Sequence, residues 1–122
     1  MPSREQVSRF IQSSFRSVWS LEVLLLLKRE RRSWTSEEIV AALRASELII
    51  SQSVAALGAA GLVVTDREGR TEYRPTDAAA AQLVEEAERL YGLSPDAVRR
   101  LIIGSYASGL AAFADAFRLR KD

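Results

Sequence analysis

Apolar residues recur every three or four positions along most of the chain, which is the spacing of one face of an α-helix. Capping signals divide this pattern, because Ser3 with Gln6 and Thr35 with Glu38 have the spacing of capping boxes. We therefore predict four helices before Gly61. The first spans 4–13, the second runs from Phe15 to the basic residues 28–32, and the third spans 36–44. The fourth spans 46–60, is capped by Ser46 and buries Ile50, Val54 and Leu57.

After Gly61 the period changes from 3.6 to about two, which is typical of strands. The segments 62–65 and 70–74 read as two strands, and 66–69 reads as a turn in which Gly69 takes the left-handed position. The pattern predicts a β-hairpin.

The last third of the chain is again helical in pattern. We expect Pro75 to end the hairpin, Thr76 to cap a helix over 77–91, and Gly92 to close that helix. Ser94 and Pro95 form an N-cap and first-turn pair that opens a final helix over 95–118.

The composition narrows the chemistry that the chain can perform. A length of 122 residues suits one domain, and the chain contains no cysteine and no histidine. This excludes disulfides, thiolate nucleophiles, imidazole bases and the metal sites that those side chains hold. We therefore expect a protein without catalytic activity, metal or cofactor. A charged first segment and apolar runs short of about 20 strongly apolar residues predict a cytoplasmic protein without a membrane partner.

The net charge of +1 conceals local concentrations of charge. The densest basic cluster is Lys-Arg-Glu-Arg-Arg at 28–32, and the hairpin alternates arginines with acidic residues. The cluster is either a solvated helix end or a phosphate clamp, and the hairpin charges are either cross-strand ion pairs or contacts to an anionic partner.

The order of elements, with two short helices followed directly by a hairpin, carries a family resemblance. The stretch EEIVAALRASELIISQSVAALGAAGLV at 37–63 resembles the winged helix-turn-helix superfamily, and DREGRTEYRPT at 66–76 resembles the hairpin of MarR-like and PadR-like bacterial regulators. The resemblance implies a single mainly α domain over 1–122 with a small β-hairpin wing. The helix-turn-helix would occupy 36–60 and the wing 62–75, with dimerisation helices over 4–13 and 95–118.

The resemblance also implies that the chain binds double-stranded DNA as a dimeric transcriptional regulator. The second helix of the motif would then present its first turns to the major groove. The candidate base contacts are Glu47, Leu48, Ile49, Ser51, Gln52 and Ser53. None of these residues is basic, so we expect few direct hydrogen bonds to bases and weak discrimination between DNA sequences. The candidate phosphate contacts are Ser36, Arg67, Arg70 and Arg74.

Leu48 and Ile49 are apolar where a DNA-reading helix is usually polar. If they are exposed, the alternative function is a winged-helix module whose helix-turn-helix face binds a protein partner. If the helix over 4–13 covers them, they belong to the core.

The final helix is apolar over more than one face, which requires two covering surfaces and predicts a homodimer. The candidate interface residues are Leu101, Ile102, Tyr106, Leu110, Phe113 and Phe117. A third hypothesis is a small-molecule sensor with a pocket lined by Trp19, Trp34, Tyr91 and Tyr106.

Overall fold

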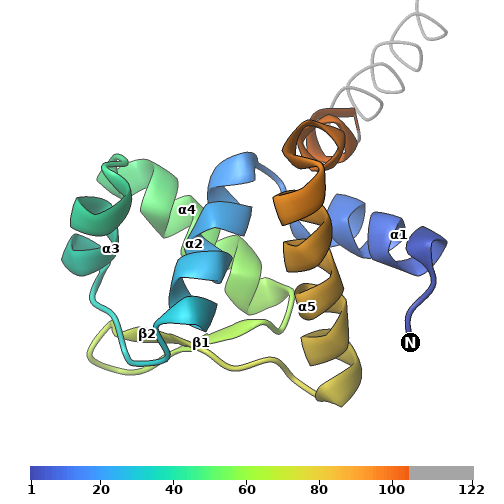
Figure 1. The fold of residues 1–122 in the computed structure, drawn as a ribbon. Coiled ribbons are helices and arrows are strands. Elements are labelled where there is room, and N and C mark those ends of the chain that lie inside the picture. The colour runs from blue at the N-terminus through green and yellow to red at the C-terminus, as the bar shows by residue number, and fades with distance from the viewer. Residues whose placement is uncertain (105–122) are drawn as a thin grey trace, which may run out of the picture.

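The computed structural model describes residues 1–104, which form a mainly helical fold with one small antiparallel sheet (Figure 1). The final helix begins at 95 and is described as far as 104, so the predicted segment 105–118, with Tyr106, Leu110, Phe113 and Phe117, lies outside the described residues. The named elements are α1 (Arg4–Ser14), α2 (Val18–Arg29), α3 (Ser36–Leu43), α4 (Glu47–Ala59), β1 (Val63–Thr65), β2 (Thr71–Tyr73) and α5 (Ala78–Leu93).

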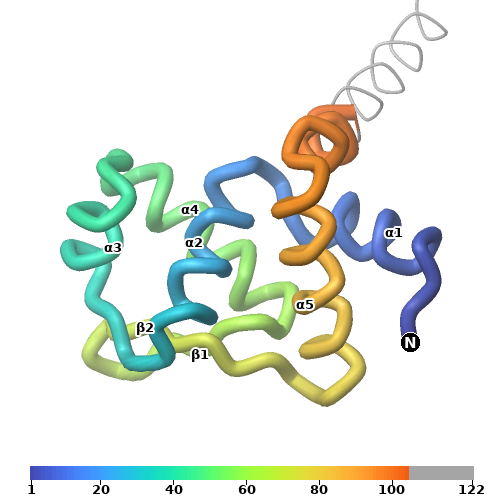
Figure 2. The backbone as a smooth tube through the Cα atoms, viewed as in Figure 1, coloured from blue at the N-terminus to red at the C-terminus, as the bar shows by residue number. Residues whose placement is uncertain are grey.

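Helix α2 is the centre of the fold. Its apolar run is buried from both sides, and Leu21, Leu24 and Leu27 have no exposed surface. Helices α3 and α4 lie on one side of α2, α5 lies on the other, and α1 packs against α5 (Figure 2). Burying this much leucine surface supplies the main driving force for folding.

The predicted helix starts are confirmed at three of the caps. The Ser3–Gln6 and Thr35–Glu38 capping boxes form with both of their hydrogen bonds, and the Ser46 hydroxyl accepts a bond from the Ile49 amide at 3.2 Å. The prediction that the second helix begins at Phe15 is wrong. Phe15 is extended and its ring is buried, and α2 begins after a further capping box made by Ser17 and Ser20.

Gly61 ends α4 as predicted, because it adopts a positive φ of 76°. The Gly61 amide donates to the Gly58 carbonyl and the Leu62 amide donates to the Leu57 carbonyl, both at 3.1 Å, which is the Schellman pattern. The amide and hydroxyl of Thr76 then donate to the Gly61 carbonyl at 2.9 and 2.8 Å. This contact joins the end of α4 to the segment that follows the hairpin.

Two predictions about α5 are wrong. The Thr76 hydroxyl donates its hydrogen bond to the Gly61 carbonyl and does not cap α5. The N-cap is Asp77, whose carboxylate accepts a hydrogen bond from the Ala80 amide at 2.8 Å. The helix also continues through Gly92 to Leu93, because Gly92 keeps its helical backbone. The carbonyl of Ser94 accepts from the Val98 amide, so the final helix does open at the predicted position.

The hairpin is tied to the helices by a third extended segment. β1 and β2 pair with Val63 opposite Tyr73 and Thr65 opposite Thr71, and Gly69 in the turn has the predicted positive φ of 81°. Trp34, just before α3, exchanges two backbone hydrogen bonds of 2.8 Å with Thr71. The beginning of α3 and the hairpin are therefore held side by side.

Among residues 1–104, no single helix has the length and apolar content needed to cross a membrane. Two pairs of consecutive helices reach that length and apolar content when each pair is counted together, but both pairs are sharply bent: α1 with α2 by 107° and α3 with α4 by 113°.

Candidate functional site

The exposed side of α4 carries most of the residues predicted to contact bases. Glu47, Leu48, Ser51 and Gln52 are exposed, while Ile49 is half-buried. Ser53 is only 3% exposed and faces α2 with Ile50 and Leu57, so it lies in the core rather than on the outer surface. The predicted core residue Val54 is instead half-buried, although it packs against the core.

Leu48 and Ile49 are not covered by α1, as one hypothesis proposed, because α1 packs against α5. Leu48 is 66% exposed, and Trp19 at the beginning of α2 is 37% exposed. Ile49 lies beside Trp19 and Arg16 at the edge of the same surface. An apolar surface therefore exists on α4, and the beginning of α2 forms its other border.

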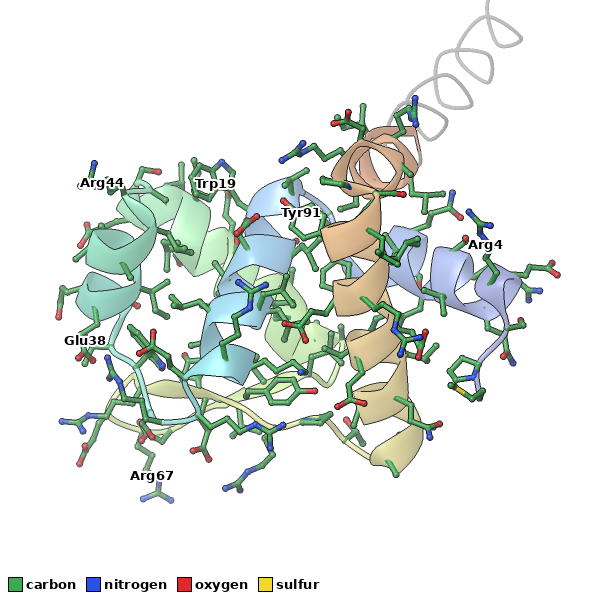
Figure 3. All side chains as sticks on the ribbon, in the orientation of Figure 1. Arg4, Trp19, Glu38, Arg44, Arg67 and Tyr91 are labelled. Carbon is green, nitrogen blue, oxygen red and sulfur yellow. The ribbon has the colours of Figure 1, made fainter. Side chains whose placement is uncertain are left out.

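The predicted phosphate contacts are all exposed. Ser36 is the first residue of α3, and Arg67 is in the hairpin turn next to Asp66, whose carboxylate accepts hydrogen bonds from the Glu68 and Arg70 amides. The Trp34–Thr71 pairing keeps the beginning of α3 close to the hairpin, and Figure 3 places Glu38 and Arg67 at the same end of the molecule.

Ion pairs in the hairpin connect residues two positions apart, and none found among residues 1–104 joins opposite strands, which was one of the two interpretations of the hairpin charges. Arg70 lies 3.8 Å from Glu68, and Arg74 lies 2.7 Å from Glu72. Within the described part of the chain Arg67 has no ion-pair partner, so its charge is available to an external anion.

The basic cluster at 28–32 is largely engaged within the chain. Lys28 and Arg29 both contact Glu88 of α5, at 2.8 and 3.2 Å. Burial raises the pKa of the Glu88 carboxyl, but the hydrogen bonds and charges of Lys28 and Arg29 outweigh that effect and leave its pKa lowered. The remaining arginines also have partners, because Arg31 lies over the Tyr73 ring and Arg32 over Trp34 and against Glu38.

The aromatic residues considered for a sensor pocket do not gather in one place. Trp34 is buried, and its indole N–H donates to the Glu30 carbonyl at 3.0 Å. Trp19 and Tyr91 line a shared hollow, and the Tyr91 hydroxyl donates to the Glu22 carboxylate at 2.6 Å. Burial and this carboxylate raise the pKa of Tyr91. Tyr106 lies outside the described residues.

The predicted dimer residues that fall within the described chain differ in exposure. Ile102 is 3% exposed and belongs to the core of its own chain, while Leu101 is half-buried. The large apolar side chains that are exposed near this end are Leu93, at 76%, and Ile103, at 60%. Sequence periodicity did not single out Leu93, because it follows the glycine that was expected to end α5.

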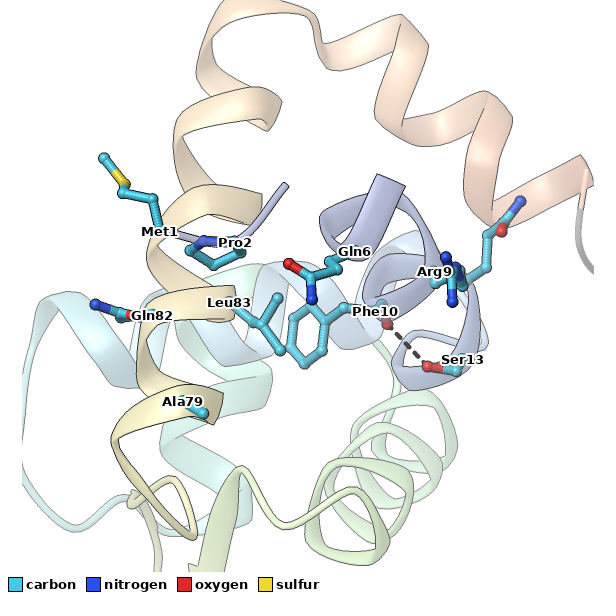
Figure 4. A pocket seen from close by; sticks show the side chains of 10 residues that line it. Met1, Pro2, Gln6, Arg9, Phe10, Ser13, Ala79, Gln82 and Leu83 are labelled. Carbon is cyan, nitrogen blue, oxygen red and sulfur yellow. Dashed lines mark hydrogen bonds between the residues drawn. The ribbon is translucent and has the colours of Figure 1, made fainter. Parts of the chain in front are cut away.

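A groove of about 930 Å³ is lined by residues of α1 and α5 and by Met1 and Pro2 (Figure 4). Phe10 of α1 and Leu83 of α5 form its apolar floor, and Gln6, Arg9 and Gln82 stand around it. No polar group is buried in it, so it has the character of a contact surface more than of a reaction site.

The geometry of residues 1–104 offers no group of three or more acidic side chains that could hold a metal ion. Comparisons with models of protein families, with curated proteins and with solved structures each returned no match.

Proposed function

We propose that this chain is a winged helix-turn-helix protein that binds double-stranded DNA as a dimeric transcriptional regulator, without catalytic activity. The observation that carries the proposal is the Trp34–Thr71 pairing, which holds the first turn of α3 beside a hairpin that follows α4 directly. The order of two short helices and a hairpin supports the assignment of three DNA-contacting elements to one continuous stretch of chain.

Each element has a distinct part in this proposal. Helix α4 enters the major groove, where Gln52 can pair with adenine and Ser51 can bond a base or a phosphate. Arg67 reaches phosphates or the minor groove from the hairpin turn, and the amides at the beginning of α3, next to Ser36, donate hydrogen bonds to a phosphate oxygen. Because no basic side chain stands on the exposed face of α4, affinity comes mainly from phosphates and sequence preference is weak.

The dimer part of the proposal is supported by exposed apolar surface near the C-terminal end. Leu93 and Ile103 would lose contact with water if a second copy covered them, together with Leu101. Sedimentation at tens of micromolar, roughly the range in which ordinary dimers persist, should give a dimer. A well-behaved monomer would contradict it.

Binding to DNA is tested by fluorescence anisotropy with labelled fragments of genomic DNA at two salt concentrations. We expect saturable binding that weakens steeply as salt rises, because phosphate contacts release counterions. An absence of binding at the lower salt concentration would overturn the proposed function.

A protein partner is the second candidate function, and one observation favours it. Leu48 and Trp19 are large apolar side chains exposed on the surface that would otherwise face DNA. In that case α4 binds an apolar segment of another protein, and the anisotropy experiment detects no DNA binding.

A further inference from the structure

Trp19 stands between two hollows. The first has a volume of about 370 Å³ and lies between α2 and α4, with Arg16 and Ile49 in its lining. The second has a volume of about 320 Å³ and lies between α2 and the end of α5, with Leu43 and Tyr91 in its lining. Because the Trp19 side chain borders both, the hollows form one groove, which we call the Trp19 groove.

The Trp19 groove carries apolar surface that is open to water in the described chain. Trp19 is 37% exposed, and Ile49, Leu43 and Tyr91 are half-buried. Leu48, which is 66% exposed, extends this surface along the first turn of α4. A partner that places one apolar side chain in each hollow would cover Trp19 from both sides and remove that area from water.

The spacing of the two hollows suits a helix. They share one side chain, that of Trp19, and residues three or four positions apart on one face of a helix stand roughly 6 Å from each other. An amphipathic helix that lies along the groove can therefore place one apolar residue in each hollow. Helices commonly bind to apolar grooves in this way.

Two arginines beside the groove have no carboxylate partner. Arg16 lines the first hollow, and Arg44 follows Leu43 of the second; neither forms an ion pair within residues 1–104. Figure 3 shows Arg44 and Trp19 at the same end of the molecule. Arg44 also has a positive φ of 55°, a conformation that costs free energy for a residue with a Cβ. Both charges are available to an acidic partner.

The carboxylates near the groove do not cancel this charge. Glu22 in the second hollow accepts the Tyr91 hydroxyl at 2.6 Å, and Asp96 is paired with Arg99 at 3.1 Å. Glu47 is exposed at the beginning of α4, where the helix dipole favours a negative charge, and it opposes only one of the two arginines. The positive surplus favours an acidic occupant over the chain's own segment 105–122, which contains three basic and two acidic residues.

We propose that the Trp19 groove binds an acidic amphipathic helix of another protein. Two apolar side chains of that helix enter the hollows on either side of Trp19, and its carboxylates pair with Arg16 and Arg44. Such a helix uses the apolar surface and the positive charge together, whereas DNA phosphates would use the arginines and leave Trp19 in water.

The proposal implies a means of regulation. Ile49 and Gln52 line the groove and also belong to the side of α4 that is proposed to face DNA. The acidic helix and DNA therefore exclude each other, and the helix releases the protein from DNA. This competition rests on the proposed function, whereas docking of the helix does not.

The two tryptophans allow a direct test of docking with the ¹⁵N-labelled protein and no DNA. Trp19 lines the groove, while Trp34 is buried elsewhere, so their indole N–H signals report site and fold separately. The probe is a synthetic helix of Ala and Glu in which one Phe and one Leu stand four positions apart, titrated to about 1 mM. One control peptide carries Lys in place of Glu, and the other carries Ala in place of Phe and Leu. We expect only the probe to move the Trp19 signal saturably, with Trp34 unmoved.

Charge reversal identifies the arginine that holds the helix. Arg16→Glu should raise the dissociation constant of the probe about tenfold, while Arg4→Glu, on α1, should leave it unchanged. The Trp34 signal shows that each variant is folded. An unmoved Trp19 signal, equal binding of the three peptides, or equal affinity in the two variants would overturn the proposal.

The competition is measured by adding the probe to the protein bound to labelled DNA. We expect the anisotropy to fall to that of free DNA at probe concentrations that saturate the Trp19 signal. A probe that saturates Trp19 without releasing DNA would overturn the regulatory part. A protein that binds the probe but no DNA would instead overturn the proposed function and leave the docking site confirmed, so the two failures can be distinguished.

Discussion

Lys28 of α2 and Glu88 of α5 are 60 positions apart in the sequence and form an ion pair of 2.8 Å between Nζ and Oε1. Only 14% of the Lys28 side chain and 24% of the Glu88 side chain are exposed. Arg29 contacts the second carboxylate oxygen, so one acidic residue holds two cations at the contact between α2 and α5.

Replacing Glu88 by Gln should lower the free energy of unfolding by about 1–2 kcal/mol, because Lys28 would keep a charge in a half-buried place without its partner. Denaturation in urea measures the loss. The matched control is Glu5→Gln, which removes an ion pair of the same length, 2.8 Å, whose side chains are 70% and 78% exposed. That change should have almost no effect, and equal losses in the two variants would contradict our account of Glu88.

Stability should also fall in acid in a way that depends on Glu88. The pKa of this carboxyl is lowered in the folded chain, so its contribution is fully present above the ordinary value of 4.5 and is lost as pH falls through the folded value. Urea midpoints measured from pH 6 downward should decrease below about pH 4.5. The decrease should be shallower in Glu88→Gln, and identical slopes would show that other carboxylates carry the acid sensitivity.

Gly61→Ala should destabilise the chain by about 2 kcal/mol or more, for two reasons. The alanine would have to adopt the left-handed backbone conformation of Gly61, and its Cβ would collide with the Thr76 hydroxyl. The control is Gly58→Ala in the same helix, where nothing lies within 4 Å of the added methyl and φ is not positive. That change should stabilise by about 0.5–1 kcal/mol. Thermal melting compares the two, and adding Thr76→Ala to Gly61→Ala should restore only the part of the loss that comes from the collision.

The local parts of this fold could be predicted from the sequence, because short-range chemistry decides them. Ser3, Thr35 and Ser46 each cap the helix that follows, and Gly61 and Gly69 both take the positive φ that their turns need. Each of these outcomes depends on residues within about four positions.

The remaining features depend on contacts between distant segments. Ser53 and Val54 differ by one position on α4, and only the packing of α4 on α2 decides that Ser53 faces inward. Likewise, nothing near the basic cluster indicates that Lys28 would meet Glu88. The candidate DNA surface could thus be placed on α4, while the inward position of Ser53 could not be foreseen.

If DNA is the ligand, Arg67→Ala should weaken binding to all sequences alike and lower the slope of log K against log salt by about 0.9. Arg67 is exposed in the hairpin turn and has no ion-pair partner in the region described. The control is Arg4→Ala, at the other end of the molecule in Figure 3, which should leave both affinity and slope unchanged. A change of preference at one base position would show that Arg67 reads sequence.

Leu48→Ser distinguishes the two candidate functions. Because Leu48 is 66% exposed, the free energy of unfolding should change by less than about 0.5 kcal/mol. DNA affinity should be nearly unchanged, since at most one thymine-methyl contact is lost. If α4 binds a protein, the same change should remove an anchor of that interface. Anisotropy and a pull-down, read beside the melting curve, separate these outcomes.

The pairing of Trp34 with Thr71 has a consequence for how the chain folds. Its two hydrogen bonds close a long loop that contains α3, α4 and β1. Closing this loop costs conformational entropy, and the contacts that offset this cost form only when all three elements are in place. The hairpin by itself is a pair of three-residue strands, too short to persist alone. The helix pair and the hairpin therefore form and dissolve as one cooperative unit, and the Trp34 and Thr71 amides should be among the slowest to exchange with deuterium.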